Sequence, residues 1–217
     1  MSRTAQHIIM HLKQDIADGI LKPGDQLEES MLSERFDVSR TPIREAIRSM
    51  VDCGLLTTRP RKGAFVRVLS AKELTDLFEL AAELEAMASK LAARSPTRDI
   101  VNTLEQALEQ CHIAAKNDKI KEYAKANLNF HHAIHQASNN DWLVKQLENI
   151  ELHINFYRAL PYEIMGRLTK SFEEHQEIYF AIINGKTDEA RTLTYDHMML
   201  QGQRIPSILQ ALGNESL

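Results

Sequence analysis

The sequence predicts a mostly α-helical protein: an N-terminal winged helix-turn-helix of three helices and a β-hairpin wing, followed by an all-α antiparallel bundle of about six helices. Three observations predict this fold. A sharp turn and a short amphipathic helix with a row of arginines occupy Asp37–Val51. Two β-prone runs follow, and no convincing strand is found beyond residue 70. Gly and Pro number only 8 and 6 of 217 residues, which favours helix.

The first two helices are predicted from their apolar spacing. Residues 5–20 place apolar side chains on one helical face: Ile8, Ile9, Leu12, Ile16 and Ile20. Leu21–Leu27 contains a Pro-Gly turn that leads into a short strand. Glu29–Phe36 is the second predicted helix, with three side chains directed inward: Met31, Leu32 and Phe36.

The third helix has the clearest local signals. We expect Val38 and Ser39 to form a tight turn, Thr41 to be the N-cap and Pro42 to take the first helical position, where no backbone N–H is needed. Gly54 suits the position just after the C-terminus. The apolar face of this third helix consists of residues at helical spacing: Ile43, Ile47 and Met50.

Arginines form a separate stripe on this helix at four-residue intervals: Arg40, Arg44 and Arg48. Arginine can donate two hydrogen bonds to the guanine edge in the major groove of DNA. A helix with a sharp start, one apolar face and an arginine row is typical of a helix-turn-helix recognition helix. The alternative is a surface helix with solvated arginines.

The runs Leu55–Arg59 and Ala64–Leu69 predict a hairpin whose tip carries Arg61 and Lys62. Such a wing can reach the minor groove or the phosphates beside a recognition helix, whereas the alternative is a solvated turn. The charge distribution favours DNA contact. The chain carries a net charge of −4, yet Arg35–Arg67 holds 8 basic and 3 acidic residues. This predicts a local anion-binding face and argues against a general polyanion binder.

A domain boundary is predicted at residue 70, which separates a DNA-binding domain (residues 1–69) from a helical domain (residues 70–217). Ser70–Glu73 is a capping box that opens the bundle. A second capping box, Ser171–Glu174, marks the fifth helix of the bundle, which can begin a few residues earlier. The other predicted helices are Ala71–Arg94, Thr97–Lys116, Lys119–Ser138, Asp141–Leu160 and a last helix of about 20 residues capped by Thr187.

The cellular compartment is predicted from two features of the sequence: its lack of membrane-spanning and secretory segments, and its few cysteines. No run of about 18 apolar residues is found, so we expect no membrane contact, and the N-terminus lacks the features of a secretory signal. Cys53 and Cys111 have neither metal-type spacing nor the number expected of a disulfide framework. These features favour a cytoplasmic protein.

The segment Ile16–Val66 strongly resembles the DNA-binding domain of the GntR family of bacterial transcription regulators. It shares the Pro-Gly turn, the VSRTPIREA core, the GLL segment and the RKGAFV wing. The remaining chain resembles the helical effector domain of the FadR-type (FCD) subfamily. The motifs that carry this second resemblance are Leu84-Glu85, Asn127–His131, Ala137–Asn140, Glu174-His175, and Ala190 with His197.

The GntR resemblance implies which residues meet DNA. Ser39, Arg40, Thr41 and Arg44 are expected to contact bases or phosphates, and Gly63 is expected to let the wing backbone approach the groove. It also implies a homodimer that places two recognition helices on an inverted-repeat operator. Dimerisation agrees with the few contacts that one small winged domain can make.

The FCD resemblance implies a metal site in the bundle. Taken singly, a histidine is more often a surface or core residue than a ligand, and the chain has 9 of them. In the subfamily, however, four residues, usually Asp-His-His-His, converge on a divalent metal. The corresponding residues here are Asn127, His131, His175 and His197, which suit zinc, nickel or manganese.

This sequence departs from the subfamily at two positions of the site. Asn127 replaces an anionic ligand, which weakens metal binding, and His135, one turn beyond His131, is the candidate substitute. Many members carry an arginine at the position of Ala81 that binds a carboxylate of the effector. Arg158 is the candidate that replaces it here.

These features predict a sequence-specific DNA-binding transcription regulator, by family habit a repressor of a metabolic operon. Its predicted effector is a small organic acid that binds at or near the metal, and the protein is predicted not to be an enzyme. One alternative is a regulator for which the metal itself is the signal. A metal-dependent hydrolase is a weaker alternative, because the sequence has no nucleophile elbow, no Gly-rich phosphate loop and no recognisable general base beside the histidines.

Overall fold

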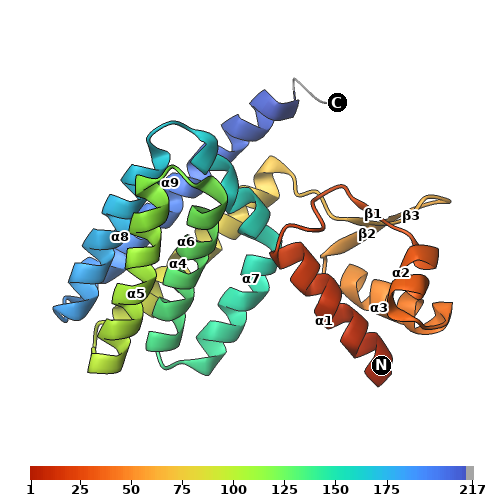
Figure 1. The fold of residues 1–217 in the computed structure, drawn as a ribbon, viewed down its shortest axis with the longest axis horizontal. Coiled ribbons are helices and arrows are strands. Elements are labelled where there is room, and N and C mark those ends of the chain that lie inside the picture. Colours follow the sequence, from red (N-terminus) through yellow and green to blue (C-terminus); the bar gives the residue numbers. More distant parts are fainter. Residues whose placement is uncertain (214–217) are drawn as a thin grey trace. The chain divides into compact units, whose positions relative to one another are not determined.

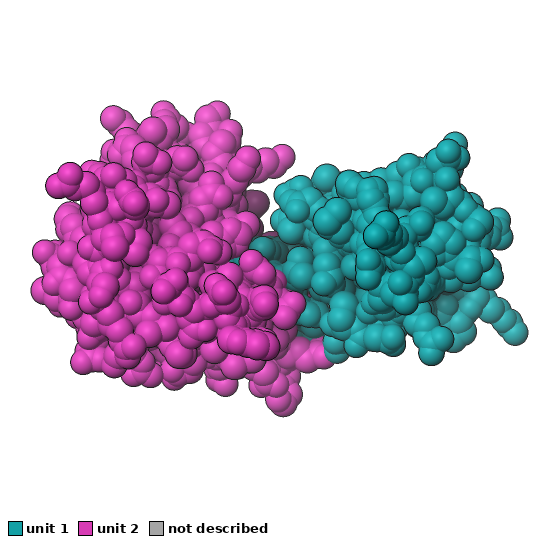
Figure 2. Space-filling model, turned by 90° about the horizontal axis from the view of Figure 1, so that it is seen from below, with its two compact units in different colours: residues 1–70, 151–156 teal, residues 71–150, 157–217 magenta. Residues whose placement is uncertain are grey.

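The computed structural model describes residues 1–213, which divide into two compact units (Figure 2). Unit 1 comprises Met1–Ser70 together with Glu151–Phe156. Unit 2 comprises Ala71–Ile150 and the described residues from Tyr157 onward. No helix in the described part of the chain is long and apolar enough to cross a membrane.

Unit 1 has the predicted winged helix-turn-helix architecture (Figure 1). Its three antiparallel strands lie in the order β1-β3-β2, and Thr58 pairs with Ala64 across the wing. Gly54 follows the third helix with a φ of +78°, a left-handed conformation that favours glycine. The elements are α1 (Arg3–Ala17), β1 (Gln26–Leu27), α2 (Glu29–Phe36), α3 (Arg40–Asp52), β2 (Leu56–Arg59) and β3 (Gly63–Val66).

The start of α3 differs from the prediction. Arg40 is already helical and Ser39, with extended backbone, takes the N-cap position, so the prediction that Thr41 is the N-cap was wrong. Pro42 therefore lies within the first turn. It is tolerated there because the first four backbone N–H groups of a helix have no intrahelical acceptor.

The core of unit 1 forms between α1 and α3 and includes Ile8, Leu12 and Ile43. Two predicted inward residues are instead exposed. Ile20 is 66% exposed because α1 ends at Ala17, before the residue completes another helical turn. Met31 is 65% exposed because the short α2 buries only Leu32 among its residues.

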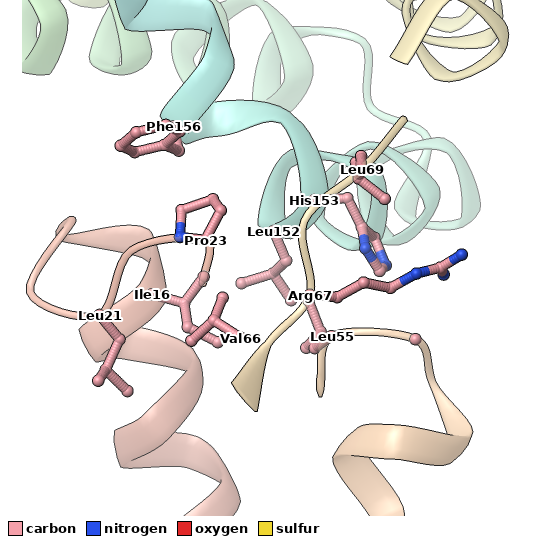
Figure 3. Close-up of a pocket in the computed structure, with 11 residues that line it drawn as sticks. Ile16, Leu21, Pro23, Leu55, Val66, Arg67, Leu69, Leu152, His153 and Phe156 are labelled. Atoms are coloured by element: carbon pink, nitrogen blue, oxygen red, sulfur yellow. The ribbon is translucent and has the colours of Figure 1, made fainter. Parts of the chain in front are cut away.

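Residues 151–156 of α7 (Asp141–Ala159) take part in the packing of unit 1. Figure 3 shows Leu152 and His153 beside Leu55 and Arg67 at a small cavity of this unit. The cavity measures about 20 Å³, enough for roughly one water molecule. Burial lowers the pKa of His153, and the positive charges of Arg67 and Lys13 lower it further.

Unit 2 is the predicted helical bundle, in which α4 packs along α9 and α5 packs against α6 and α8 (Figure 1). Two predicted helix starts are confirmed: Thr97 accepts a hydrogen bond from the N–H of Ile100, and Asn140 from that of Leu143. Unit 2 contains the residues of α7 before 151 and after 156. Its other elements are α4 (Ala71–Ala92), α5 (Arg98–Lys116), α6 (Ile120–Ala137), η1 (Leu160–Glu163), α8 (Arg167–Ile183) and α9 (Thr187–Gly213).

The capping box predicted at Ser171–Glu174 was wrong, whereas the alternative that this helix begins a few residues earlier is confirmed. Helix α8 begins at Arg167, after Gly166 with a φ of +78°, and Ser171 lies buried in its second turn. The last helix also exceeds the predicted 20 residues, since α9 has 27. Ser171 consequently faces the interior of the bundle, next to the histidines described below.

Candidate metal centre and nucleic-acid interface

Three histidines converge inside the bundle from three helices: His131 on α6, His175 on α8 and His197 on α9. One ring nitrogen from each lies within 4.8 Å of the others. The Nε2 atoms of His175 and His197 are 3.3 Å apart. All three side chains are fully buried, so the bundle brings together the histidines that the resemblance singled out.

Burial keeps these imidazoles neutral. It lowers the pKa of His131 to about 3 and that of His175 well below its ordinary value. It also lowers the pKa of His197, although the negative charge of Glu174 opposes this shift. A neutral imidazole is the form that binds a metal ion, so the cluster needs no deprotonation at neutral pH.

Two carboxylates orient two of these rings: the buried Glu85 and Glu174, which is 12% exposed. His131 donates from Nδ1 to Glu85 at 3.0 Å, and His197 donates from Nδ1 to Glu174 at 2.7 Å. When Nδ1 carries the proton, Nε2 presents its lone pair, which is the arrangement found around protein-bound metals. The Nε2 of His197 faces the side-chain amide of Gln201, whose Nε2 lies 2.8 Å away. The Nε2 atom of His131 is buried and has no hydrogen-bond partner among the described residues.

Asn127 lies one turn before His131 on α6 and is buried. Its Oδ1 atom has no hydrogen-bond partner among the described residues. Buried acceptors without a partner are rare in folded proteins. Three imidazole nitrogens and one amide oxygen form a donor set that suits zinc, nickel or manganese, so the residues fit the implied metal.

Replacement of Asn127 tests its place in this donor set. We expect Asn127→Asp to bind Zn²⁺ about tenfold more tightly, because a carboxylate adds the negative charge that the amide lacks. The metal-free variant should unfold at a lower temperature, because an unpaired carboxylate is costly to bury. Isothermal titration calorimetry and thermal unfolding measure the two effects. Weaker Zn²⁺ binding than in the wild type would exclude Asn127 as a ligand.

His135 binds Glu85 and does not complete the histidine cluster. Its Nε2 atom lies 2.8 Å from the same Glu85 oxygen that His131 contacts. Burial opposes ionisation of Glu85, but His135 and His131 lower its pKa well below the ordinary value. The group of Glu85, His131 and His135 also has the spacing of a cation site. The guanidinium of Arg158, 3.4 Å from Glu85, already supplies positive charge there.

Two arginines are buried in the bundle. Arg158, the predicted effector ligand, contacts Glu85 through Nη1 and the sulfur of Met198 through Nη2 at 3.5 Å. Arg167, which the sequence analysis missed, makes two hydrogen bonds to Glu174 at 2.9 and 2.8 Å. Arg167 and His197 hold the pKa of Glu174 at about 2 against the effect of burial.

The four-residue spacing of polar side chains along two helices is a sequence signal that could have pointed to Arg167. On α6, polar side chains recur every four residues on a buried face: Tyr123, Asn127, His131 and His135. On α8, the same spacing joins Arg167, Ser171 and His175. Side chains four residues apart lie on the same face of a helix, so each helix contributes one continuous polar stripe to the bundle core.

The predicted DNA-contacting residues are all exposed on unit 1: Ser39, Arg40, Thr41, Arg44, Arg48, Arg61, Lys62 and Gly63. An open groove is lined by Arg40 from the start of α3 and by Arg61 and Gly63 from the wing. The recognition helix and the wing therefore share one surface. Arg44 lies further along the helix, where its Nε donates to Glu29 at 2.9 Å.

The wing tip is held in place by its backbone. Arg61 and Gly63 adopt left-handed conformations, with φ of 62° and 87°. The Nε2 of Gln26 in β1 donates to the carbonyl of Lys62 at 2.7 Å. These features present the basic tip of the hairpin to solvent beside α3.

Comparison with known protein families divides the chain in the same way. Residues 4–66 match the bacterial regulatory proteins of the gntR family, and residues 76–199 match the FCD domain. The solved structure of McbR/YncC from Escherichia coli has a similar fold, with a TM-score of 0.80 and 24% identity over 98% of this chain and all of that one.

Two curated relatives span nearly the whole chain. The Nta operon transcriptional regulator of Aminobacter aminovorans is 33% identical over 198 residues, which cover 89% of this chain and 90% of that protein. The transcriptional repressor RspR of E. coli is 25% identical over 94% of this chain and 90% of its own length. The chain therefore belongs to the GntR family of DNA-binding transcription regulators, with a C-terminal FCD domain.

Proposed function

We propose that this regulator is a homodimeric repressor that binds an inverted-repeat operator and is controlled by a small organic acid bound beside a divalent metal in the FCD domain. The observation that carries the proposal is the cluster of three neutral, buried imidazoles, from His131, His175 and His197. Repression is supported by relatives named as repressors, among them RspR and the gluconate operon repressor of Bacillus licheniformis.

The metal would be held by these three histidines together with Oδ1 of Asn127. When bound, it supplies a Lewis-acidic charge that attracts a carboxylate. The chain's own residues do the rest: Glu85 and Glu174 fix the rings of His131 and His197, and burial excludes competing water.

On DNA, the proposed contacts fall into two groups. Ser39, Arg40, Thr41, Arg44 and Arg48 would meet the major groove from α3, where arginine side chains can read base edges. Arg61, Lys62 and Gly63 would meet the adjacent minor groove or the phosphates from the wing. The exposure of all eight residues supports this assignment.

The acid can control DNA binding only if it binds one arrangement of the dimer more tightly than another. The test is the affinity of the full chain for a DNA fragment from upstream of its own gene, measured by fluorescence anisotropy. We expect Zn²⁺-loaded protein to bind the fragment and a panel of small organic acids to contain members that release it. The same acids should have no effect on His175→Ala.

Two results would change this proposal. Metal-dependent DNA binding that no acid in the panel alters would favour the metal itself as the signal. DNA binding that responds to an acid equally in the wild type and in His175→Ala would place the effector away from the histidine cluster and contradict the proposal.

A further inference from the structure

An acidic side chain lies among the basic residues of the proposed DNA-binding surface. Glu29, the first residue of α2, lines the same open groove as Arg40 and Arg61, together with its neighbour Glu28. A carboxylate at this place repels the phosphates of DNA and lowers the affinity for a duplex of any sequence. Its position is therefore unfavourable for DNA binding unless Glu29 contributes something else.

The stability of the fold does not explain this position. Glu29 forms an ion pair with Arg44, but the two side chains are 36% and 64% exposed, so water and salt screen the attraction between them. The negative charge of Glu29 also suits the amino-terminal end of α2. Glu28, directly before this helix, supplies a second negative charge there. Neither effect explains why Glu29 is paired with an arginine from another helix.

The hydrogen bond between the two side chains leaves the far end of the Arg44 guanidinium open. The Nε of Arg44 donates to an oxygen of Glu29 at 2.9 Å, and its two terminal nitrogens have no hydrogen-bond partner among the described residues. Two N–H groups of an arginine can bind O6 and N7 of one guanine in the major groove. Glu29 thus occupies one nitrogen of Arg44 and leaves two donors available for this contact.

Arg44 is the only arginine of α3 that is paired with an acid in the described part of the chain. Arg40 and Arg48 are exposed and form no such pair there. An unpaired arginine samples many rotamers and can bind a phosphate in DNA of any sequence. A guanidinium that is fixed before binding loses less conformational freedom at the correct base, and it turns less readily toward a phosphate. The pairing of Arg44 therefore favours a base contact over a phosphate contact.

We propose that Glu29 is a specificity-determining residue, which positions Arg44 for a guanine of the operator and reduces its contacts with phosphates. In this arrangement Glu29 contacts no base itself and acts through Arg44. The inference rests on the contact of Arg44 with DNA proposed above. It adds a residue that lowers the affinity for all DNA and raises the discrimination between sequences.

Glu28→Gln is the matched control for Glu29→Gln. Both variants remove one negative charge from the same groove and keep the size of the side chain, but only Glu29→Gln removes the carboxylate that binds Arg44. The side chain of Glu28 makes no capping hydrogen bond to α2. A change that the two variants share therefore reports charge, and a difference between them reports the positioning of Arg44.

Fluorescence anisotropy measures the affinity of each full-length variant for two duplexes: an operator that the wild-type protein selects from random DNA, and an unrelated sequence. We expect Glu28→Gln to strengthen binding to both duplexes by the same factor. Glu29→Gln should strengthen binding to the unrelated duplex by that factor but to the operator by less, so that the ratio of the two affinities falls by about threefold or more. In an Arg44→Ala background, the two glutamine variants should have equal ratios.

Equal ratios for Glu28→Gln and Glu29→Gln in the otherwise wild-type chain would overturn the positioning role and leave Glu29 with an effect of charge alone. A lower ratio for Glu29→Gln that persists in the Arg44→Ala background would also overturn it, because the effect would then not pass through Arg44. The proposed DNA contact fails separately. Operator affinity of Arg44→Ala equal to that of the wild type would remove Arg44 from the DNA contacts, and the inference with it.

Discussion

Removal of divalent metal with a chelator is expected to lower the unfolding temperature of the protein by roughly 5–10 °C. A ligand at 100 times its dissociation constant stabilises the folded state by about 2.7 kcal/mol, and 1 kcal/mol shifts the melting temperature of a protein of this size by about 2–4 °C. Adding Zn²⁺ back should restore the higher temperature. Differential scanning calorimetry measures the shift.

His175→Ala should abolish this metal response, because it removes the ligand that is 3.3 Å from His197 and fully buried. The matched control is His7→Ala. His7 and His11 form an exposed pair on α1, with Nε2 atoms 3.1 Å apart, that can bind metal unspecifically. If His175→Ala loses its fold, His131→Asn provides a second variant. A metal response that survives in both bundle variants but disappears in His7→Ala would refute the assignment.

Arg44→Ala is expected to weaken operator binding by about 5- to 150-fold, since one arginine that reads a base edge contributes about 1–3 kcal/mol of discrimination. The Arg44 side chain is 64% exposed and already fixed in direction by Glu29. Fluorescence anisotropy with operator and unrelated fragments, at several salt concentrations, separates loss of specificity from loss of charge.

Two further variants sharpen this test. Arg98→Ala removes an exposed arginine from α5 in unit 2 and should leave operator affinity unchanged. Glu29→Gln removes the acidic partner of Arg44 and should strengthen binding severalfold, because one negative charge leaves the DNA-facing surface. Operator binding by Arg44→Ala that matches the wild type would remove Arg44 from the recognition surface.

Local sequence patterns were sufficient for most helices because their signals are short-range. The helices predicted to start at Thr97 and Asp141 do start there within one residue, with Thr97 and Asn140 as their N-caps, and Gly54 follows the end of α3 as predicted. The errors arose where two residues offer similar local chemistry. Ser39 and Thr41 are both good N-caps, and Ser171 with Glu174 has capping-box spacing, yet tertiary packing buried Ser171 inside α8.

The histidine cluster was predicted through family resemblance, because periodicity alone does not distinguish a ligand from a core histidine. Its partners were harder to find. Glu85 is 46 residues from His131, and Glu174 is 23 from His197, so both pairs form only when α4, α6, α8 and α9 pack. The contact of Arg158, the candidate effector ligand, with Glu85 could not be predicted from the sequence either, because the two residues are 73 positions apart.

The central claim is that three buried imidazoles form the metal centre of this regulator. Crystals of Zn²⁺-loaded full-length protein, measured at the zinc absorption edge, test it most directly. We expect one strong anomalous peak about 2.0–2.1 Å from a ring nitrogen of each of His131, His175 and His197. A bound zinc whose peak lies elsewhere, for example at His7 and His11, would contradict the claim.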